Sequence, residues 1–133
     1  MKEPRGIRNC NPGNIRITKD YWKGLRPLQD DKDFYQFTSI EWGYRAMFKI
    51  LQTYRKKYGC KSIADMIARY APPSENNTDR YIQVVCEKMG KEPSFIPIVE
   101  NKRDMCMLVA AMSYMENGVL AEMEDVAKGW DLL

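Results

Sequence analysis

The spacing of apolar side chains predicts four substantial helices after the first 37 residues. In segments 38–59, 61–73, 75–90 and 101–118, apolar residues recur every three or four positions, which is the repeat of one helix face. A shorter pattern from Ala121 predicts a further, weaker helix.

Residues that favour helix ends bracket these segments. Hydroxyl side chains suit the N-terminal ends, because their oxygen can accept a hydrogen bond from a free backbone N–H; the candidates are Thr38 or Ser39, Ser62 and Thr78. Glycine or proline follows each apolar stripe and predicts where it ends, at Gly59, Pro72, Gly90 and Gly118.

The N-terminal part shows a different pattern. Residues 1–13 are rich in turn formers, and residues 14–18 alternate apolar and polar side chains as in a short strand. A polar loop over residues 19–32 leads to a second short strand over residues 33–37. We therefore expect a small antiparallel β-sheet near the N-terminus, an α+β class that is mostly helical, and one domain of 133 residues.

Charge is distributed unevenly along the chain. The net charge is +3, yet residues 1–26 hold seven Lys or Arg and two acids, a net of +5, which leaves −2 for the rest. A basic N-terminal face suits an anionic polymer, although a solvated basic edge would look the same. No apolar run approaches the roughly 18 residues of a membrane span, and no secretory signal is predicted.

Histidine is absent, and the four cysteines form no Cys-x-x-Cys pair. We therefore expect neither a metal site nor a cofactor, and catalysis of the Ser-His-Asp or Cys-His type is excluded. Any general acid or base must be Glu, Asp, Tyr, Lys or Cys. Cys86 and Cys106 occupy apolar positions of the helical patterns, so we expect buried thiols.

Several segments between residues 5 and 90 together resemble a family of small phage and prophage proteins. They are "RGIRNCNPGNIR", "YWKGL", "FYQFTSIEWGYRAM", "ILQTYRKKYG" and "ARYAPPSENNTDRYIQVV", in the order and spacing of that family. Its members have a lysozyme-like fold and are often labelled virion structural proteins. A wider resemblance links the chain to peptidoglycan glucosaminidases and lytic transglycosylases. The resemblance implies a peptidoglycan-handling domain, without implying cleavage by itself.

The resemblance also implies substrate-binding positions, which are Asn11, Asn14, Arg16, Trp22 and Tyr81. Each has a plainer structural interpretation. Asn-Pro-Gly-Asn is a strong turn signal, so the two asparagines could simply form a turn. Trp22 could close the small sheet instead of stacking on a sugar, and Tyr81 could lie at the edge of the core.

Lysozyme-like enzymes keep a catalytic glutamate at the end of a helix that precedes the sheet. Only ten residues precede Asn11 here, and Glu3 is the acid among them. The segment "LVAAMSYMENG" resembles the helix that carries the acid in transglycosylases, with Asn117 where those enzymes have serine. The resemblance then implies a circularly permuted domain in which Glu116 is the catalytic acid.

The helical pattern gives Glu116 independent support. Met105, Leu108 and Met112 form an apolar stripe, and Glu116 continues it four residues later. Burial and a helix C-terminus both raise the pKa of a carboxyl group, which helps a general acid hold its proton. The alternative is that this helix end frays and exposes Glu116 to water.

Two further acids compete for a catalytic role. Glu75, in the loop before Tyr81, is the better candidate for a second carboxylate, unless it merely marks the start of the next helix. Glu41 lies in a first helical turn and is interpreted as a helix-end charge.

The leading prediction is a peptidoglycan-cleaving glycosidase, a lytic transglycosylase or glucosaminidase, of phage or mobile-element origin. It would act in a phage virion or at the bacterial cell wall or periplasm, with peptidoglycan strands and other virion proteins as partners. The first alternative is a virion structural or glycan-binding module that does not cleave. A nucleic-acid binder ranks last, because the basic residues match no known nucleic-acid motif.

Overall fold

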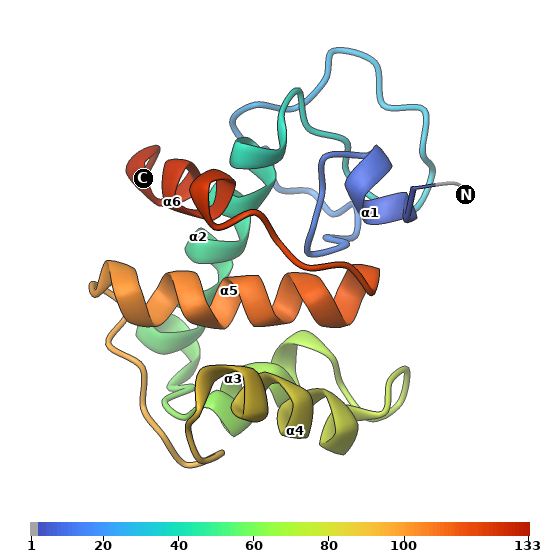
Figure 1. Ribbon diagram of the computed structural model, residues 1–133. Coiled ribbons are helices and arrows are strands. Elements are labelled where there is room, and N and C mark those ends of the chain that lie inside the picture. Colours follow the sequence, from blue (N-terminus) through green and yellow to red (C-terminus); the bar gives the residue numbers. More distant parts are fainter. Residues whose placement is uncertain (1–2) are drawn as a thin grey trace.

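A computed structural model describes residues 3–133 and shows six helices (Figure 1). They are α1 (Arg5–Arg8), α2 (Ile40–Tyr58), α3 (Ile63–Tyr70), α4 (Thr78–Met89), α5 (Lys102–Asn117) and α6 (Met123–Asp131). The five longer helices match the segments predicted from apolar periodicity. In the part of the chain that the structure describes, none of the helices combines the length and the apolar character that crossing a membrane requires.

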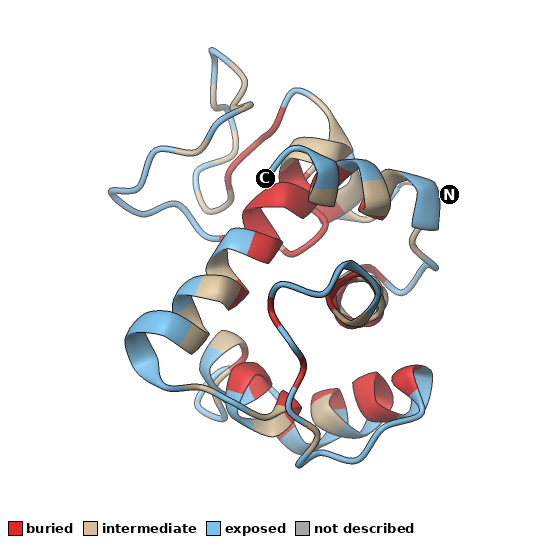
Figure 2. Cartoon of the chain, turned by 90° about the vertical axis from the view of Figure 1, so that its left-hand side faces the viewer, coloured by how far each residue is buried: buried red, intermediate tan, exposed pale blue. Residues whose placement is uncertain are grey.

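Helix α5 lies at the centre of the fold, with α6 on one side and α3 and α4 on the other, while α2 passes behind it from the α6 side toward α3 (Figures 1 and 2). Its Met105, Leu108 and Met112 are fully buried, so the predicted stripe is the core face. On the α2–α6 side, the rings of Phe48 and Trp130 pack edge to face with centroids 5.2 Å apart. The predicted buried thiols of Cys86 and Cys106 are confirmed.

The predicted helix ends are confirmed in part: Ser39 is the N-cap residue of α2, but its side chain makes no cap hydrogen bond. Ser62 forms a capping box with Asp65, as its hydroxyl predicts. Before α4 the cap is Asn77 rather than Thr78, and its side-chain oxygen accepts a hydrogen bond from the Arg80 N–H at 3.1 Å. Thr78 is instead the first residue of α4, and its hydroxyl donates to the Ala71 carbonyl at 2.6 Å.

The predicted N-terminal sheet is wrong. Over residues 3–133 there is no strand, and the two predicted strands meet at a single antiparallel bridge between Arg16 and Phe34, with another isolated bridge between Leu25 and Phe37. The class is therefore all-α, so α+β is incorrect, while the mostly helical part of the prediction is confirmed. The short helix α1 lies where only turns were expected.

Side-chain amides replace the hydrogen-bond ladder that a sheet would need. The Asn11 amide accepts a hydrogen bond from the Ile15 N–H and donates to the carbonyls of Ile15 and Tyr35 at 3.0 and 2.9 Å. Likewise, the Gln36 side-chain oxygen accepts a hydrogen bond from the Asp30 N–H at 2.7 Å. Two backbone hydrogen bonds do join the two segments, from the Ile17 N–H to the Asp33 carbonyl at 3.0 Å and from the Tyr35 N–H to the Ile15 carbonyl at 3.1 Å. Side-chain amides bond other backbone groups of these segments, and the pairing does not extend into a sheet.

Candidate active site

The carboxyl group of Glu116, in the last turn of α5, lies between two side chains from distant parts of the chain. The Asn14 side-chain N–H donates to Oε1 at 3.1 Å, and the Tyr81 hydroxyl donates to Oε2 at 2.9 Å. Glu116 is partly buried and Tyr81 is buried. The predicted juxtaposition of Glu116 with the asparagine-rich segment is therefore present, although the sheet expected beside it is not.

The turn that carries Asn14 has a strained backbone. Asn14 has φ 49°, in the left-handed region that asparagine tolerates better than most other residues. The Tyr70 hydroxyl donates to the carbonyl of Gly13 just before it. A Cβ on Gly13 would lie 2.8 Å from Cγ of Met47, so only glycine fits against the core there.

Asn117 fastens the end of α5 to the same turn. Its side-chain N–H donates to the carbonyls of Pro12 at 2.8 Å and Ser113 at 2.9 Å. Gly6 of α1 lies beneath this contact, because a Cβ there would overlap the Asn117 side-chain oxygen and lie 2.7 Å from that of Asn14. The position of the Glu116 carboxyl group is thus set by close packing between the two ends of the chain.

Burial raises the pKa of Glu116 above its ordinary value of 4.5. The hydrogen bonds from Asn14 and Tyr81 and the positive charge of Arg16 favour the ionised form and partly offset this rise. Burial also raises the pKa of Tyr81 well above 10, so its hydroxyl stays a neutral donor. Glu116 is therefore an acid with no ion-pair partner among residues 3–133.

A cavity of about 330 Å³ opens beside Glu116. Of the predicted site residues, Asn14, Arg16 and Glu75 line it together with Glu116. Glu75 is exposed and comes from the loop between α3 and α4. Four residues from three segments thus meet at one hollow.

The other predicted positions lie elsewhere. Asn11 is fully buried and its amide is engaged with backbone groups, as the turn interpretation expects. Tyr81 contacts Glu116 without lining the cavity, and Trp22 lines a neighbouring hollow. Glu41 lies in the first turn of α2, as predicted. Glu3 is exposed and lies outside the cavity.

Sequence reasoning missed two residues of the site. Tyr70 lines the cavity and supports Gly13, while its spacing in segment 61–73 indicates only an apolar helix face. Asn76 also lines the cavity, from a polar loop in which nothing distinguishes it from its neighbours. The Ala-Arg-Tyr-Ala-Pro-Pro segment around Tyr70 was a usable signal, because it belongs to the family resemblance.

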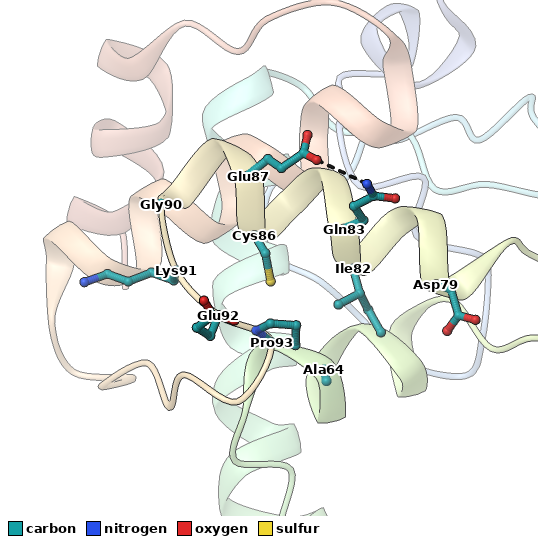
Figure 3. A pocket seen from close by; sticks show the side chains of 10 residues that line it. All are labelled: Ala64, Asp79, Ile82, Gln83, Cys86, Glu87, Gly90, Lys91, Glu92 and Pro93. Carbon is teal, nitrogen blue, oxygen red and sulfur yellow. Dashed lines mark hydrogen bonds between the residues drawn. The ribbon is translucent and has the colours of Figure 1, made fainter.

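A separate hollow of about 620 Å³ between α3, α4 and the following loop contains none of the predicted site residues (Figure 3). Cys86 points toward Pro93 there, and burial raises the pKa of its thiol, which disfavours a nucleophilic thiolate. The nearby Gln83 donates to Glu87 at 3.2 Å. Within residues 3–133, no three Cys, Asp or Glu side chains gather as a metal site would require.

Comparison with known proteins gives one relative of clear similarity. The chain is 41% identical over 119 residues to Protein P5 of Pseudoalteromonas phage PM2, and the match covers 86% of this chain and 71% of that protein. The chain belongs to the family of PM2 Protein P5. No family model matches the chain. Membership of the P5 family confirms the predicted relationship to a phage protein, whereas the virion role and peptidoglycan cleavage stay predictions.

Proposed function

We propose that this P5-family protein cleaves glycosidic bonds of peptidoglycan, with Glu116 as the general acid. The observation that carries the proposal is a partly buried carboxyl group, with no cation paired to it, held by two neutral donors at the wall of a cavity. Such a group keeps its proton to higher pH than an exposed glutamate does. It can therefore deliver that proton to a leaving oxygen.

The proposed step is protonation of the glycosidic oxygen by Glu116 as the bond to the anomeric carbon breaks. The carboxylate that remains accepts hydrogen bonds from Asn14 and Tyr81, so its new negative charge meets two donors already in place. Both donors are held rigidly, Tyr81 by burial and Asn14 by its turn.

Glu75 is the proposed second carboxylate. Among the described residues, Glu75 and Glu116 are the acidic side chains that line the cavity. A carboxylate there can activate the attacking water in hydrolysis. In a lytic transglycosylase, by contrast, the substrate's own hydroxyl attacks, and Glu75 is dispensable for chemistry.

Peptidoglycan is the proposed substrate because three observations agree. The segments around the cavity resemble peptidoglycan-cleaving enzymes, the family is a phage family, and the N-terminal region is basic. Action from the virion on the host cell wall would follow from these features.

A non-catalytic virion or glycan-binding module is the second candidate. It is favoured by the family relationship, which is to a phage protein whose name mentions no enzymatic activity. In that case the cavity would bind glycan, and Glu116 would serve as a hydrogen-bonding group.

Muropeptide release from purified peptidoglycan separates these functions. Wild type is compared with Glu116→Gln, which keeps size and removes the proton, with Glu75→Gln, and with Glu87→Gln as an exposed control outside the cavity. We expect Glu116→Gln to release fragments about 10²–10⁴ times more slowly. If Glu75→Gln lowers muropeptide release at least tenfold, the reaction is hydrolysis. If Glu75→Gln releases muropeptides as fast as wild type and the fragments carry anhydro ends, the reaction is transglycosylation.

If folded wild type releases nothing from walls of several chemotypes, the non-catalytic module is the correct function. If Glu116→Gln is as active as wild type, the acid lies elsewhere.

A further inference from the structure

A larger hollow of about 970 Å³ adjoins the Glu116 cavity. Both are lined by Ile15, Thr18, Ile50 and Tyr54, so the two hollows lie next to each other and share part of their wall. We call the larger hollow the side groove. It extends away from Glu116 toward the C-terminal turn of α2, where Lys57 and Tyr58 line it.

Aromatic side chains form much of the wall of the side groove. Tyr21, Trp22, Tyr54 and Tyr58 all line it. Tyr21 is 83% exposed and Tyr58 53% exposed, so neither side chain is buried in the core. The Tyr21 ring, together with the part of the Tyr58 ring that Arg69 does not cover, is open to solvent in the groove and suited to binding apolar parts of a ligand.

Two cations line the same groove without acidic partners. The ion pairs found among residues 3–133 involve neither Lys57 nor Arg69. The Arg69 guanidinium lies 3.6 Å from the centre of the Tyr58 ring and 5.3 Å from that of Tyr54, which fixes its position. Asp20 also lines the groove, where its carboxylate accepts a hydrogen bond from the Thr18 hydroxyl at 3.1 Å. Two cations against one acid favour an anionic ligand.

We propose that the side groove binds the stem peptide of peptidoglycan, with Lys57 and Arg69 holding the peptide carboxylates. This inference rests on the proposed function, because it takes the Glu116 cavity as the glycan site. A stem peptide branches sideways from the glycan strand and carries both methyl groups and several carboxylates, which suit the aromatic and cationic parts of the wall. In the intact strand the lactyl carboxyl group of the sugar is amide-bonded to the first residue of the peptide, so the carboxylates available to Lys57 and Arg69 are those of the peptide itself.

Binding measured in the full chain carrying Glu116→Gln tests the inference without turnover. The probes are glycan strands with intact stem peptides and the same strands after an amidase has removed the peptides, which leaves the lactyl carboxylates. Calorimetry gives a dissociation constant for each. The test variant adds Lys57→Gln and Arg69→Gln. The matched control adds Lys56→Gln, which changes an exposed cation of the same helical turn outside the groove.

We expect intact strands to bind about five- to tenfold more tightly than stripped strands, as two solvent-accessible ion pairs would produce. The double variant should lose this preference, and the Lys56→Gln control should keep it. Because Arg69 packs on two tyrosines, Lys57→Gln with Arg69→Lys is measured too, and it should retain part of the preference.

Equal affinity for both strands, or a preference that the double variant keeps, overturns the inference. Cleavage by wild type is scored separately on both strands. Cleavage without discrimination leaves the proposed function standing and overturns the side groove. Discriminating binding without any cleavage supports the side groove and rejects the proposed glycosidase.

Discussion

Asparagine side chains of one N-terminal segment hold two carboxyl groups in opposite electrostatic settings. Asn9 donates to Asp31 at 2.9 Å, and Asn14 donates to Glu116 at 3.1 Å. Asp31 also meets the Arg5 guanidinium at 2.6 and 2.7 Å, which holds its pKa well below the ordinary value. Glu116 has no such cation, and burial raises its pKa.

The comparison shows that a hydrogen bond from an amide does not decide the role of an acid. Asp31 accepts backbone N–H groups from Asp33 and Phe34 besides its cation, so it serves as an ionised clasp for the loop. Glu116 meets neutral donors and a cavity, so it can carry and release a proton.

Exchanging each acid for its amide should separate the two roles most strongly. Glu116→Gln should lower muropeptide release about 10²–10⁴-fold, because the proton donor is lost. Asp31→Asn should leave the activity of the folded protein within about threefold, because Asp31 does not line the cavity, while lowering the denaturation midpoint. Comparable losses of activity in both variants would contradict the distinction.

Gly6→Ala should have the next largest effect. It should disturb the packing that holds Glu116 and leave the ion pair of Asp31 unchanged. The new Cβ would overlap the Asn117 side-chain oxygen and lie 2.8 Å from the Asn11 carbonyl oxygen. We expect about 1–3 kcal/mol less unfolding free energy, measured in urea, together with lower activity. Arg8→Ala, an exposed change in the same helix, is the control and should have little effect. If Gly6→Ala has the stability and activity of wild type, the packing between Gly6 and the Asn117 side chain is loose.

Tyr81→Phe should have a smaller effect with a specific pH signature. Losing one hydrogen bond of about 0.5–1.5 kcal/mol should reduce activity about two- to tenfold. Because that bond favours the ionised form, its loss raises the pKa of Glu116, and the alkaline limb of the activity profile should move to higher pH. Tyr114→Phe, on helix α5 that carries Glu116, is the control. A limb that moves to lower pH would refute the assignment.

The smallest effect is an opposite pH dependence of stability. The folded pKa of Glu116 lies above 4.5, so its contribution is full below that pH and is lost as pH rises through the folded pKa. Relative to wild type, Glu116→Gln should therefore gain stability toward neutral pH. The folded pKa of Asp31 lies below 3.8, so its contribution is present above that pH and disappears in acid. The deficit of Asp31→Asn should shrink there, and parallel curves in calorimetry would contradict both assignments.

The helices could be predicted because a buried face repeats every three to four residues, and α5 shows this plainly at Met105, Leu108 and Met112. The loop region could not be predicted in this way. Ile15 and Tyr35 share one backbone hydrogen bond, and the Asn11 amide bonds both residues, which alternation in the sequence does not reveal. The ion pair of Arg5 with Asp31 joins residues 26 apart without a periodic signal. The meeting of Glu116 with Asn14 was anticipated from a resemblance between whole segments.

The tie between Asn117 and Pro12 spans 105 residues of sequence. A ribosome must therefore finish α5 before the carboxyl group of Glu116 can reach Asn14, while α2, α3 and α4 can already have formed. The site would then be among the last parts of the fold to assemble, because closing so long a loop is slow compared with forming local helices. In a nascent chain Glu116 would therefore lack its Asn14 partner, and the proposed activity would begin only after synthesis has passed residue 117.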